Sequence, residues 1–374
     1  MKKGLGVLLS VCLLVLGSCA SRIPEEGAAS SIVYEQSKND TTYGSFADTF
    51  LITGFAQKTP EALADEFQHV IYYNESMMEG VMNTPASLLI NTLNESVLLS
   101  YDKQSGVFAD ACRDTLCGHE SCLFGTSGNR VYCGADGLFV LASKDDETVL
   151  YHTDFTASDA KKLYTCKNTL SYVVQEGEYV YFLEEALDEQ TNETISRIMR
   201  MKATGSDAEI LLEQPGLYYY MPMGGNILYL DPNDGFVLYD TQANETSAFG
   251  SAELLPIALC GNDFYYEQNG ALYRASDYGT GDAKLLAEDI QINEFLFDGE
   301  SIYFHDGKTV YRTDMGFAEI QEIYTAETDE RISNVIVDDH MLFYRYTVRK
   351  GSSRKHHFVF VDLQTDNVLE VVNE

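Results

Sequence analysis

The sequence lacks tryptophan altogether, has only seven prolines, and carries few cations, with 25 Lys and Arg against 58 Asp and Glu and a formal net charge of −33 at pH 7. So acidic a chain argues against nucleic acid as a partner and against docking on anionic lipid, because both ligands would repel it. Known catalytic signatures are also missing: there is no Gly-x-Ser-x-Gly elbow, no His-Glu-x-x-His and no Walker loop. The catalytic residues are therefore unknown, and the sequence leaves open whether the protein is an enzyme.

Long apolar runs are missing except near the N-terminus, where two lysines precede the apolar residues 4–16. That stretch has the length of a signal-peptide core and is too short to span a bilayer. Residues 16–19 read Leu-Gly-Ser-Cys, which resembles the bacterial lipobox. We therefore expect residues 1–18 to be a lipoprotein signal peptide and Cys19 to carry the lipid that anchors the protein.

This anchor predicts where the protein lies. It would be exposed on the extracellular face of the cell membrane, or on the periplasmic side or outer membrane of a Gram-negative host, and would contact the membrane through its lipid only. Residues 19–45 are rich in Ala, Ser, Glu and Asn, so we expect the lipidated Cys19 to be followed by a flexible tether. Residues 46–374 remain for one folded domain.

A short aromatic strand core recurs in the rest of the chain. It occurs at 71–73, 138–140, 179–182, 227–229, 264–266, 302–304 and 342–344. Turn residues such as Asp136-Gly137 precede most of these cores, and a second strand, a short apolar run and one more strand follow. Four strands in each unit of about 40–45 residues is the period of a β-propeller, whose blades bury both faces by packing side by side.

We therefore predict an all-β fold, a β-propeller of four-stranded blades over residues 46–374. The length of the chain favours seven blades and leaves six or eight open, and a β-sandwich is the competing architecture. Thr59 and Pro60 have the pattern of a helix start, so a short helix is expected over 59–69, on the N-terminal side of the propeller.

Two features of the sequence resemble a known group of proteins. One is the blade phrase at 264–286, an aromatic strand and turn followed by Leu-Tyr-Arg and Lys-Leu-Leu; the other is the strand at 99–106 followed by the cysteine segment 112–122. In both, the chain is similar to exported propeller lipoproteins of Gram-positive gut bacteria, related to the domain of unknown function 5050 and to TolB-like propellers. Thr115 stands where that group usually has Pro. The resemblance implies a propeller fold and a surface location, and it implies no reaction.

Four cysteines and a histidine form the clearest local constellation: Cys112, Cys117, His119, Cys122 and Cys133. Three thiols and an imidazole within eleven residues could close a tetrahedral zinc site, and Cys133 could replace one ligand. Thiols outside the cell tend to oxidise, so a disulfide staple is the alternative, and unpaired thiols are the third reading. The staple suits an exported protein best, so no cofactor is predicted, with zinc at this cluster as the alternative.

Five cations gather between two strands of the last blade, in what reads as a long hairpin: Arg345, Arg349, Lys350, Arg354 and Lys355. They predict contact with an anionic partner, such as a teichoic acid or an acidic protein, and a solvated hairpin is the alternative.

Two other features are expected to be structural. The acidic stretch 184–193 reads as a solvated hairpin tip, since it lacks the spacing of a calcium loop. Cys166 and Cys260 stand alone at strand ends and are expected to be buried as small apolar side chains.

The leading functional hypothesis is a surface-anchored binding or scaffold module, a monomer, for an unknown extracellular ligand or envelope protein. A rigid ring with variable loops on one face suits recognition. The first alternative is a hydrolase acting on cell-wall or dietary polysaccharide or peptide, which requires converging carboxylates with raised pKa values. The second is a structural subunit of an envelope complex, which requires a large exposed apolar patch.

Overall fold

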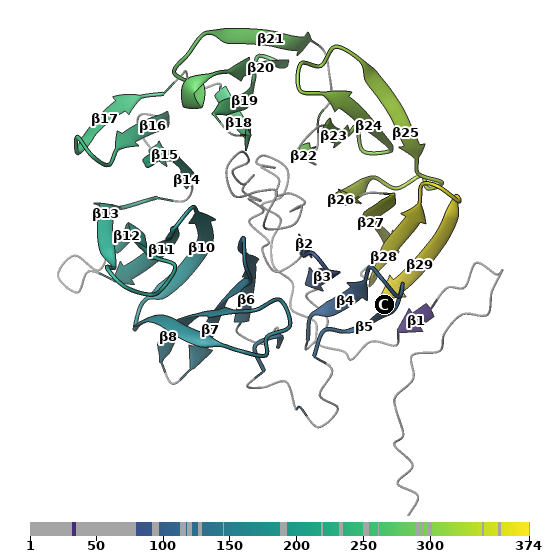
Figure 1. Cartoon of the computed structure of the whole chain (residues 1–374), viewed down its shortest axis with the longest axis horizontal. Helices are drawn as coiled ribbons and strands as arrows, with labels where there is room; N and C mark the ends of the chain where they lie inside the picture. The colour runs from purple at the N-terminus through teal and green to yellow at the C-terminus, as the bar shows by residue number, and fades with distance from the viewer. Residues whose placement is uncertain are drawn as a thin grey trace, which may run out of the picture.

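The computed structural model is a seven-bladed β-propeller, in which seven sheets are arranged around a ring (Figure 1). The all-β prediction and the choice of seven blades are confirmed. The structure describes residues 32–34, 80–91, 97–112, 117, 122–125, 129–144, 146–187, 193–217, 220–231, 235–249, 254–260, 262–288, 292, 295–297, 301–338, 340–350 and 353–373. The helix expected over 59–69 lies outside this part, and no helix within it is long and apolar enough to cross a membrane.

Each blade consists of four consecutive antiparallel strands, with the first nearest the centre of the ring (Figure 1). The first blade contains β2 (Gly80–Asn83), β3 (Ser87–Asn91), β4 (Leu99–Asp102) and β5 (Phe108–Asp110). The second contains β6 (Asn129–Cys133), β7 (Leu138–Lys144), β8 (Glu147–Thr153) and β9 (Lys161–Cys166). The third contains β10 (Thr169–Glu176), β11 (Tyr179–Leu187), β12 (Thr194–Lys202) and β13 (Glu209–Gln214).

The other blades repeat this order. The fourth contains β14 (Tyr220–Met223), β15 (Asn226–Asp231), β16 (Gly235–Asp240) and β17 (Glu245–Ala248). The fifth contains β18 (Leu254–Cys260), β19 (Asp263–Gln268), β20 (Ala271–Ala275), the 3₁₀ turn η1 (Asp277–Gly279) and β21 (Ala283–Glu288). The sixth contains β22 (Phe295–Phe297), β23 (Ser301–His305), β24 (Thr309–Asp314) and β25 (Ile320–Thr325). The seventh contains β26 (Ile332–Asp338), β27 (Met341–Lys350), β28 (Ser353–Asp362), β29 (Asn367–Asn373) and, beside β29, β1 (Ile32–Tyr34) from the stretch expected to be a tether.

Each blade buries both of its faces, which explains why the second strands read as continuous apolar runs instead of alternating ones. Tyr181 and Phe182 are neighbours on β11 and point to opposite faces of the sheet, yet both are almost fully buried. Phe182 belongs to one apolar cluster with Phe139 of the second blade, and Tyr181 to another with Tyr229 of the fourth. The core is therefore a series of layers between blades, and solvent reaches outer strands such as β17, whose residues are all exposed.

The ring closes between its seventh and first blades without the exchange of an inner strand. Strands β26 to β29 all come from the C-terminal part of the chain, and β1 joins the outer edge by parallel pairing with β29. Tyr101 of the first blade stacks on Phe360 of the seventh, with 4.0 Å between ring centroids. The ammonium of Lys103 donates a hydrogen bond to the carbonyl of Thr84 at 2.6 Å and pairs with the carboxylate of Asp338 in the seventh blade. Side-chain contacts therefore hold the two ends of the ring together.

The connectivity gives the ring two different faces. Strands within a blade are consecutive and antiparallel, so the connections between first and second strands lie on the same face as those between third and fourth strands. We call this the turn face. The hairpins between second and third strands, and the connections from one blade to the next, lie on the opposite face, which we call the loop face.

The turn face is built from short, repeated turns. In five blades an Asp at or next to the end of the third strand accepts hydrogen bonds from backbone N–H groups two to four residues further on: Asp102, Asp154, Asp240, Asp314 and Asp362. These donors stabilise the carboxylate and lower the pKa of Asp240, Asp314 and Asp362. The repetition marks this face as structural, which leaves the loop face free to vary.

Candidate functional site

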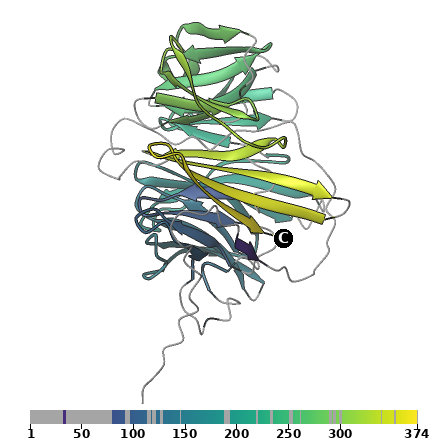
Figure 2. The ribbon, with the colours of Figure 1, turned by 90° about the vertical axis from the view of Figure 1, so that its right-hand side faces the viewer.

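The loop face carries the three features that the sequence analysis singled out. The connection from β5 to β6 contains Cys112, Cys117 and Cys122, and the acidic hairpin joins β11 to β12. The basic hairpin joins β27 to β28, whose long yellow strands extend past the neighbouring blades in the side view of Figure 2. Because rigid scaffolds place binding groups on the loops between their strands, this face is the candidate functional site.

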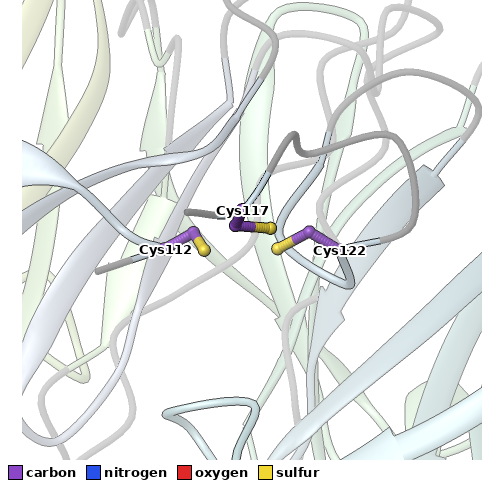
Figure 3. Close-up of side chains that lie close together, drawn as sticks. All are labelled: Cys112, Cys117 and Cys122. Atoms are coloured by element: carbon purple, nitrogen blue, oxygen red, sulfur yellow. The ribbon is translucent and has the colours of Figure 1, made fainter. Parts of the chain in front are cut away.

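Three thiols converge in the connection between the first and second blades. The sulfur atoms of Cys112, Cys117 and Cys122 all lie within 4.8 Å of one another, and the three side chains are partly buried. Figure 3 shows the three side chains together, with the sulfur atoms of Cys117 and Cys122 facing each other. The structure thus brings together three of the five residues of the predicted constellation.

The backbone around the cluster is held against the start of β4. The N–H of Ala111, next to Cys112, donates to the carbonyl of Leu98 at 2.7 Å, and the N–H of Leu98 donates to Phe124 at 2.8 Å. The carbonyl of Cys122 accepts two hydrogen bonds at 2.9 Å, from the N–H of Gly125 and from the side-chain amide of Asn129. The backbone is therefore held by hydrogen bonds next to Cys112 and at Cys122, one of them from Asn129 at the start of β6, as a preformed site requires.

The remaining residues of the constellation are not part of the cluster. His119 lies outside the described residues. Cys133 ends β6 and does not belong to the group of three; its thiol donates to the carbonyls of Asn83 and Gly134, at 3.6 Å each. Desolvation raises the pKa of this thiol to about 12.

The two lone cysteines both lie at strand ends, as expected. Cys166 ends β9, is partly buried, and donates a hydrogen bond from its thiol to the carbonyl of Asn168 at 3.3 Å. It is therefore less buried than the sequence suggested. Cys260 ends β18, and its side chain is outside the described part of the structure.

The basic residues do occupy a hairpin of the last blade, but they do not share one surface. β27 and β28 are the longest strands in the described chain, at ten residues each. Arg349 and Lys350 are exposed at the end of β27, and neither has an ion-pair partner in the described structure. Arg345 and Lys355 are partly buried lower in the hairpin, each with its own partner, and Arg354 is described by its backbone only. Two free cations therefore face solvent.

The stem of this hairpin is held by a polar cluster. Tyr346 and His357 stack with their ring centroids 4.3 Å apart. Both reach the same carboxylate oxygen of Glu370 on β29, at 2.5 Å from the tyrosine hydroxyl and 2.6 Å from Nδ1 of His357. Burial and the carboxylate raise the pKa of Tyr346. These contacts restrict the motion of the hairpin that ends in Arg349 and Lys350. The hairpin therefore loses less conformational entropy when a partner binds.

The acidic hairpin is less solvated at its base than the sequence suggested. Glu184 is 3% exposed on β11. Its carboxylate accepts hydrogen bonds from Tyr164 at 2.9 Å and from Asn168 at 2.7 Å, and it pairs with Arg197 at 3.1 Å. Arg197 also pairs with Glu213 on β13. Glu184 is therefore a structural residue that ties the third blade to the second.

A second buried carboxylate, which the sequence analysis did not single out, joins the third and fourth blades on the turn face. Glu176 ends β10, is 8% exposed, and accepts a hydrogen bond from the N–H of Gly224 at 2.7 Å. Burial raises the pKa of Glu176. The adjacent Gln175 reaches the second blade, where its side-chain oxygen accepts from the N–H of Ala135 at 2.9 Å. No signal in the sequence separates these contacts from ordinary turn residues.

These two glutamates also bear on catalysis. Among the described residues they are the buried acids, and each is occupied by contacts to a neighbouring blade. They lie near opposite ends of the third blade, Glu176 at its turn face and Glu184 toward its loop face. They are therefore not the converging pair that a glycoside hydrolase uses.

A chain of tyrosines links the inner strands of three blades. The hydroxyl of Tyr132 on β6 accepts from the backbone N–H of Tyr172 on β10 at 3.1 Å, and the hydroxyl of Tyr220 on β14 donates to the carbonyl of Tyr172. Tyr172 lies in a bulge of β10 and has a φ of 52°, a strained value for a residue with a side chain. Burial raises the pKa of Tyr132 to about 12, so this hydroxyl stays protonated. The tyrosines thus satisfy backbone groups that the bulge leaves unpaired.

Comparison with known proteins supports the fold. No family model matches the sequence, and no curated protein matches it. Among solved structures, the chain is similar to a prolyl endopeptidase, with 10% identity over 79% of this chain and 50% of that one and a TM-score of 0.52. It is also similar to an acylaminoacyl peptidase in complex with a chloromethyl ketone, with 10% identity over 80% of this chain and 65% of that one and a TM-score of 0.51. TolB from Acinetobacter baumannii is matched at 14% identity over 79% and 82% of the two chains, with a TM-score of 0.38.

These likenesses define the class of the protein. At this identity the two peptidase structures show the fold alone, and they agree with the strand order in making the chain a β-propeller. The chain spans half to two-thirds of the length of the two peptidases.

Proposed function

We propose that this protein is a lipid-anchored surface module whose loop face binds an anionic polymer of the cell envelope. The observation that carries the proposal is that Arg349 and Lys350, one on each side of the longest hairpin in the described chain, are both exposed at its end. Cell-wall polymers that carry phosphate in their backbone, such as teichoic acids, have the charge that this pair would recognise.

Ion pairing of other Lys and Arg side chains supports the choice of Arg349 and Lys350 as the binding residues. The chain has more than two carboxylates for each base, and several bases are ion-paired within or between blades. Arg200 pairs with Glu209 at 2.7 Å, and Lys202 pairs with Asp207 at 3.5 Å. Arg349 and Lys350 are consecutive on β27 and so point to opposite sides of the hairpin, but neither has an ion-pair partner among the described residues, which leaves the tip locally positive on an otherwise negative protein.

The position of the hairpin relative to the expected anchor favours a partner close to the membrane. The hairpin belongs to the seventh blade, and β1 pairs with β29 in the same blade. If Cys19 carries the lipid, the chain from Cys19 to Ile32 reaches at most about 45 Å when fully extended. The basic hairpin would then stay close to the membrane and would meet an anionic polymer near its surface.

The other two hypotheses are less well supported by the described residues. The buried carboxylates serve contacts between blades, as shown above. The exposed large apolar side chains are Val107, Leu187, Ile210, Leu285, Ile320 and Val368. Ile210, Leu285 and Ile320 lie on the outer strands of three different blades, so they do not form one patch of the size that a structural subunit would need.

The test is a binding measurement with matched variants. The full chain, purified in detergent, is titrated with poly(glycerol phosphate) by calorimetry at low and at physiological salt. Arg349→Ser together with Lys350→Ser is expected to weaken binding about tenfold or more, which is about 1.4 kcal/mol. The control is Lys162→Ser with Lys284→Ser, which removes the same charge from exposed sites on β9 and β21 and should change affinity less than about twofold.

Binding by the hairpin should also weaken as salt rises, because the contact is electrostatic and exposed. An absence of binding at low salt would refute the proposal, as would an equal loss in both double variants. Stronger binding to poly-glutamate than to poly(glycerol phosphate) would replace the envelope polymer with an acidic protein as the partner.

A further inference from the structure

We infer that Cys112, Cys117 and Cys122 form a site for a thiophilic metal ion, with Zn²⁺ as the best match, in the connection between the first and second blades. The inference is independent of the anionic partner proposed above. It concerns residues on the same face of the ring, so the ion would help to shape that face.

The geometry of the three sulfur atoms favours a metal over a disulfide. In a tetrahedral site with Zn–S bonds of about 2.3 Å, two sulfur atoms lie about 3.8 Å apart. The three sulfur atoms here lie within 4.8 Å of one another, so a shift of about 1 Å brings all three into bonding range of one ion. A disulfide joins only two sulfur atoms, at about 2.05 Å, and would leave the third thiol of the convergent set unused.

The chemistry of the donors selects the class of ion. Thiolates are soft ligands that prefer Zn²⁺, Cu⁺ and similar ions to Mg²⁺ or Ca²⁺, which bind oxygen. Binding converts the three thiols to thiolates and releases their protons to solvent, so affinity rises with pH. Three thiolates fill three of the four tetrahedral positions and leave the fourth for water or another donor. Cys133 is not that donor, because its thiol is directed to the carbonyls of Asn83 and Gly134.

The surroundings of the cluster suit a structural ion. Cys112 and Cys122 pack at the edge of a small apolar cluster that includes Leu98 and Phe124. The thiols of Cys112 and Cys122 therefore lie beside apolar side chains that limit their contact with water, as the apolar shell around a metal site does. The hydrogen bond from Asn129 to the carbonyl of Cys122 fixes one ligand from outside the coordination sphere.

The experiment measures metal binding by the reduced, metal-free full chain. Native mass spectrometry with added Zn²⁺ is expected to show one ion per chain, and Co²⁺ should produce the near-ultraviolet absorption of thiolate-to-cobalt charge transfer. Cys112→Ser, Cys117→Ser and Cys122→Ser should each weaken binding by more than the 10–100-fold that outer-shell changes cost. Cys133→Ser and Cys166→Ser are the matched controls and should bind like the wild type.

A second measurement, alkylation of the wild-type chain, tests the inference without relying on variants that fail to fold. In the wild-type chain, Zn²⁺ should shield these three cysteines from alkylation, with peptide mapping used to locate the labels. Circular dichroism of each variant shows whether the propeller is intact. The inference is overturned if the reduced wild-type chain takes up no metal, if a folded Cys117→Ser variant binds as tightly as the wild type, or if Zn²⁺ leaves the alkylation of these cysteines unchanged.

Discussion

Replacing Lys103 with Met should loosen the ring where its first and last blades meet. Lys103 donates a hydrogen bond at 2.6 Å to the carbonyl of Thr84 and pairs with Asp338, and the two charged side chains are 17% and 26% exposed. A hydrogen bond to a charged group contributes about 1.5–3 kcal/mol to the free energy of unfolding. Because the two charged side chains are partly exposed, we expect Lys103→Met to lower the free energy of unfolding by about 2 kcal/mol. Met keeps the apolar stem of the side chain, so the loss of stability comes mainly from removal of the charged ammonium group.

Urea unfolding of Lys103→Met, Asp338→Asn and the double variant measures the coupling between the two residues, which should be about 1–2 kcal/mol. The same cycle at Lys202 and Asp207 is the control and should give less than about 1 kcal/mol, because both side chains are exposed where β12 ends and the turn to β13 begins. Hydrogen exchange should show a local effect, with amides of β2, β3, β26 and β27 losing protection while β14 and β15 across the ring keep theirs.

A coupling below about 0.5 kcal/mol would refute this reasoning. A uniform loss of amide protection around the ring would also refute this reasoning. It would mean that breaking the contact between the first and seventh blades destabilises all blades equally. In either case the apolar packing between the two blades, including Tyr101 and Phe108 against Phe360, would remain to hold the ring closed.

Three further predictions follow from individual contacts. The hydroxyl and N–H of Ser158 and of Thr156 lower the pKa of Asp154 to about 2, so its stabilising effect is complete above the unfolded pKa of about 3.9 and is lost as the pH falls toward 2. Asp154→Ala should therefore lower the free energy of unfolding at pH 7 and change it little at pH 2; equal losses at both would contradict this. Tyr132→Phe leaves the partly buried N–H of Tyr172 without its acceptor and should lower the free energy of unfolding by about 1–3 kcal/mol in thermal or urea unfolding, whereas an unchanged stability would show that the bulge needs no partner. Cys133, whose desolvation raises the pKa of its thiol to about 12, should react with iodoacetamide at pH 8 much more slowly than an unfolded cysteine peptide, and a comparable rate would show that this thiol is not desolvated.

Much of the fold could be predicted from local sequence signals. The aromatic runs at 138–140, 179–182 and 302–304 all became second strands, because a strand buried on both faces must be apolar at every position. The recurring Asp after the third strand was visible in the sequence as well, as in Asp240 and Asp362, and could have been used to count the blades. Its role as a turn acceptor depends only on residues two to four positions away.

The site was predicted less well, because its residues depend on distant parts of the chain. The basic stretch was predicted as one tip, but pairing between β27 and β28 places Arg345 in the body of the blade and leaves Arg349 and Lys350 exposed. Glu184 was expected in solvent, and residues of the preceding blade-to-blade connection and of β12 bury and pair it.

The sequence alone determined the class of fold and the period of the blades, because both follow from interactions between residues close together along the chain. Only the tertiary structure decided which loops share a face, which three of the four clustered cysteines converge, and how Lys103 meets Asp338 from 235 residues away. These relations come from the closing of the ring, and no local pattern of residues encodes the distance between two segments that meet only when all seven blades are packed.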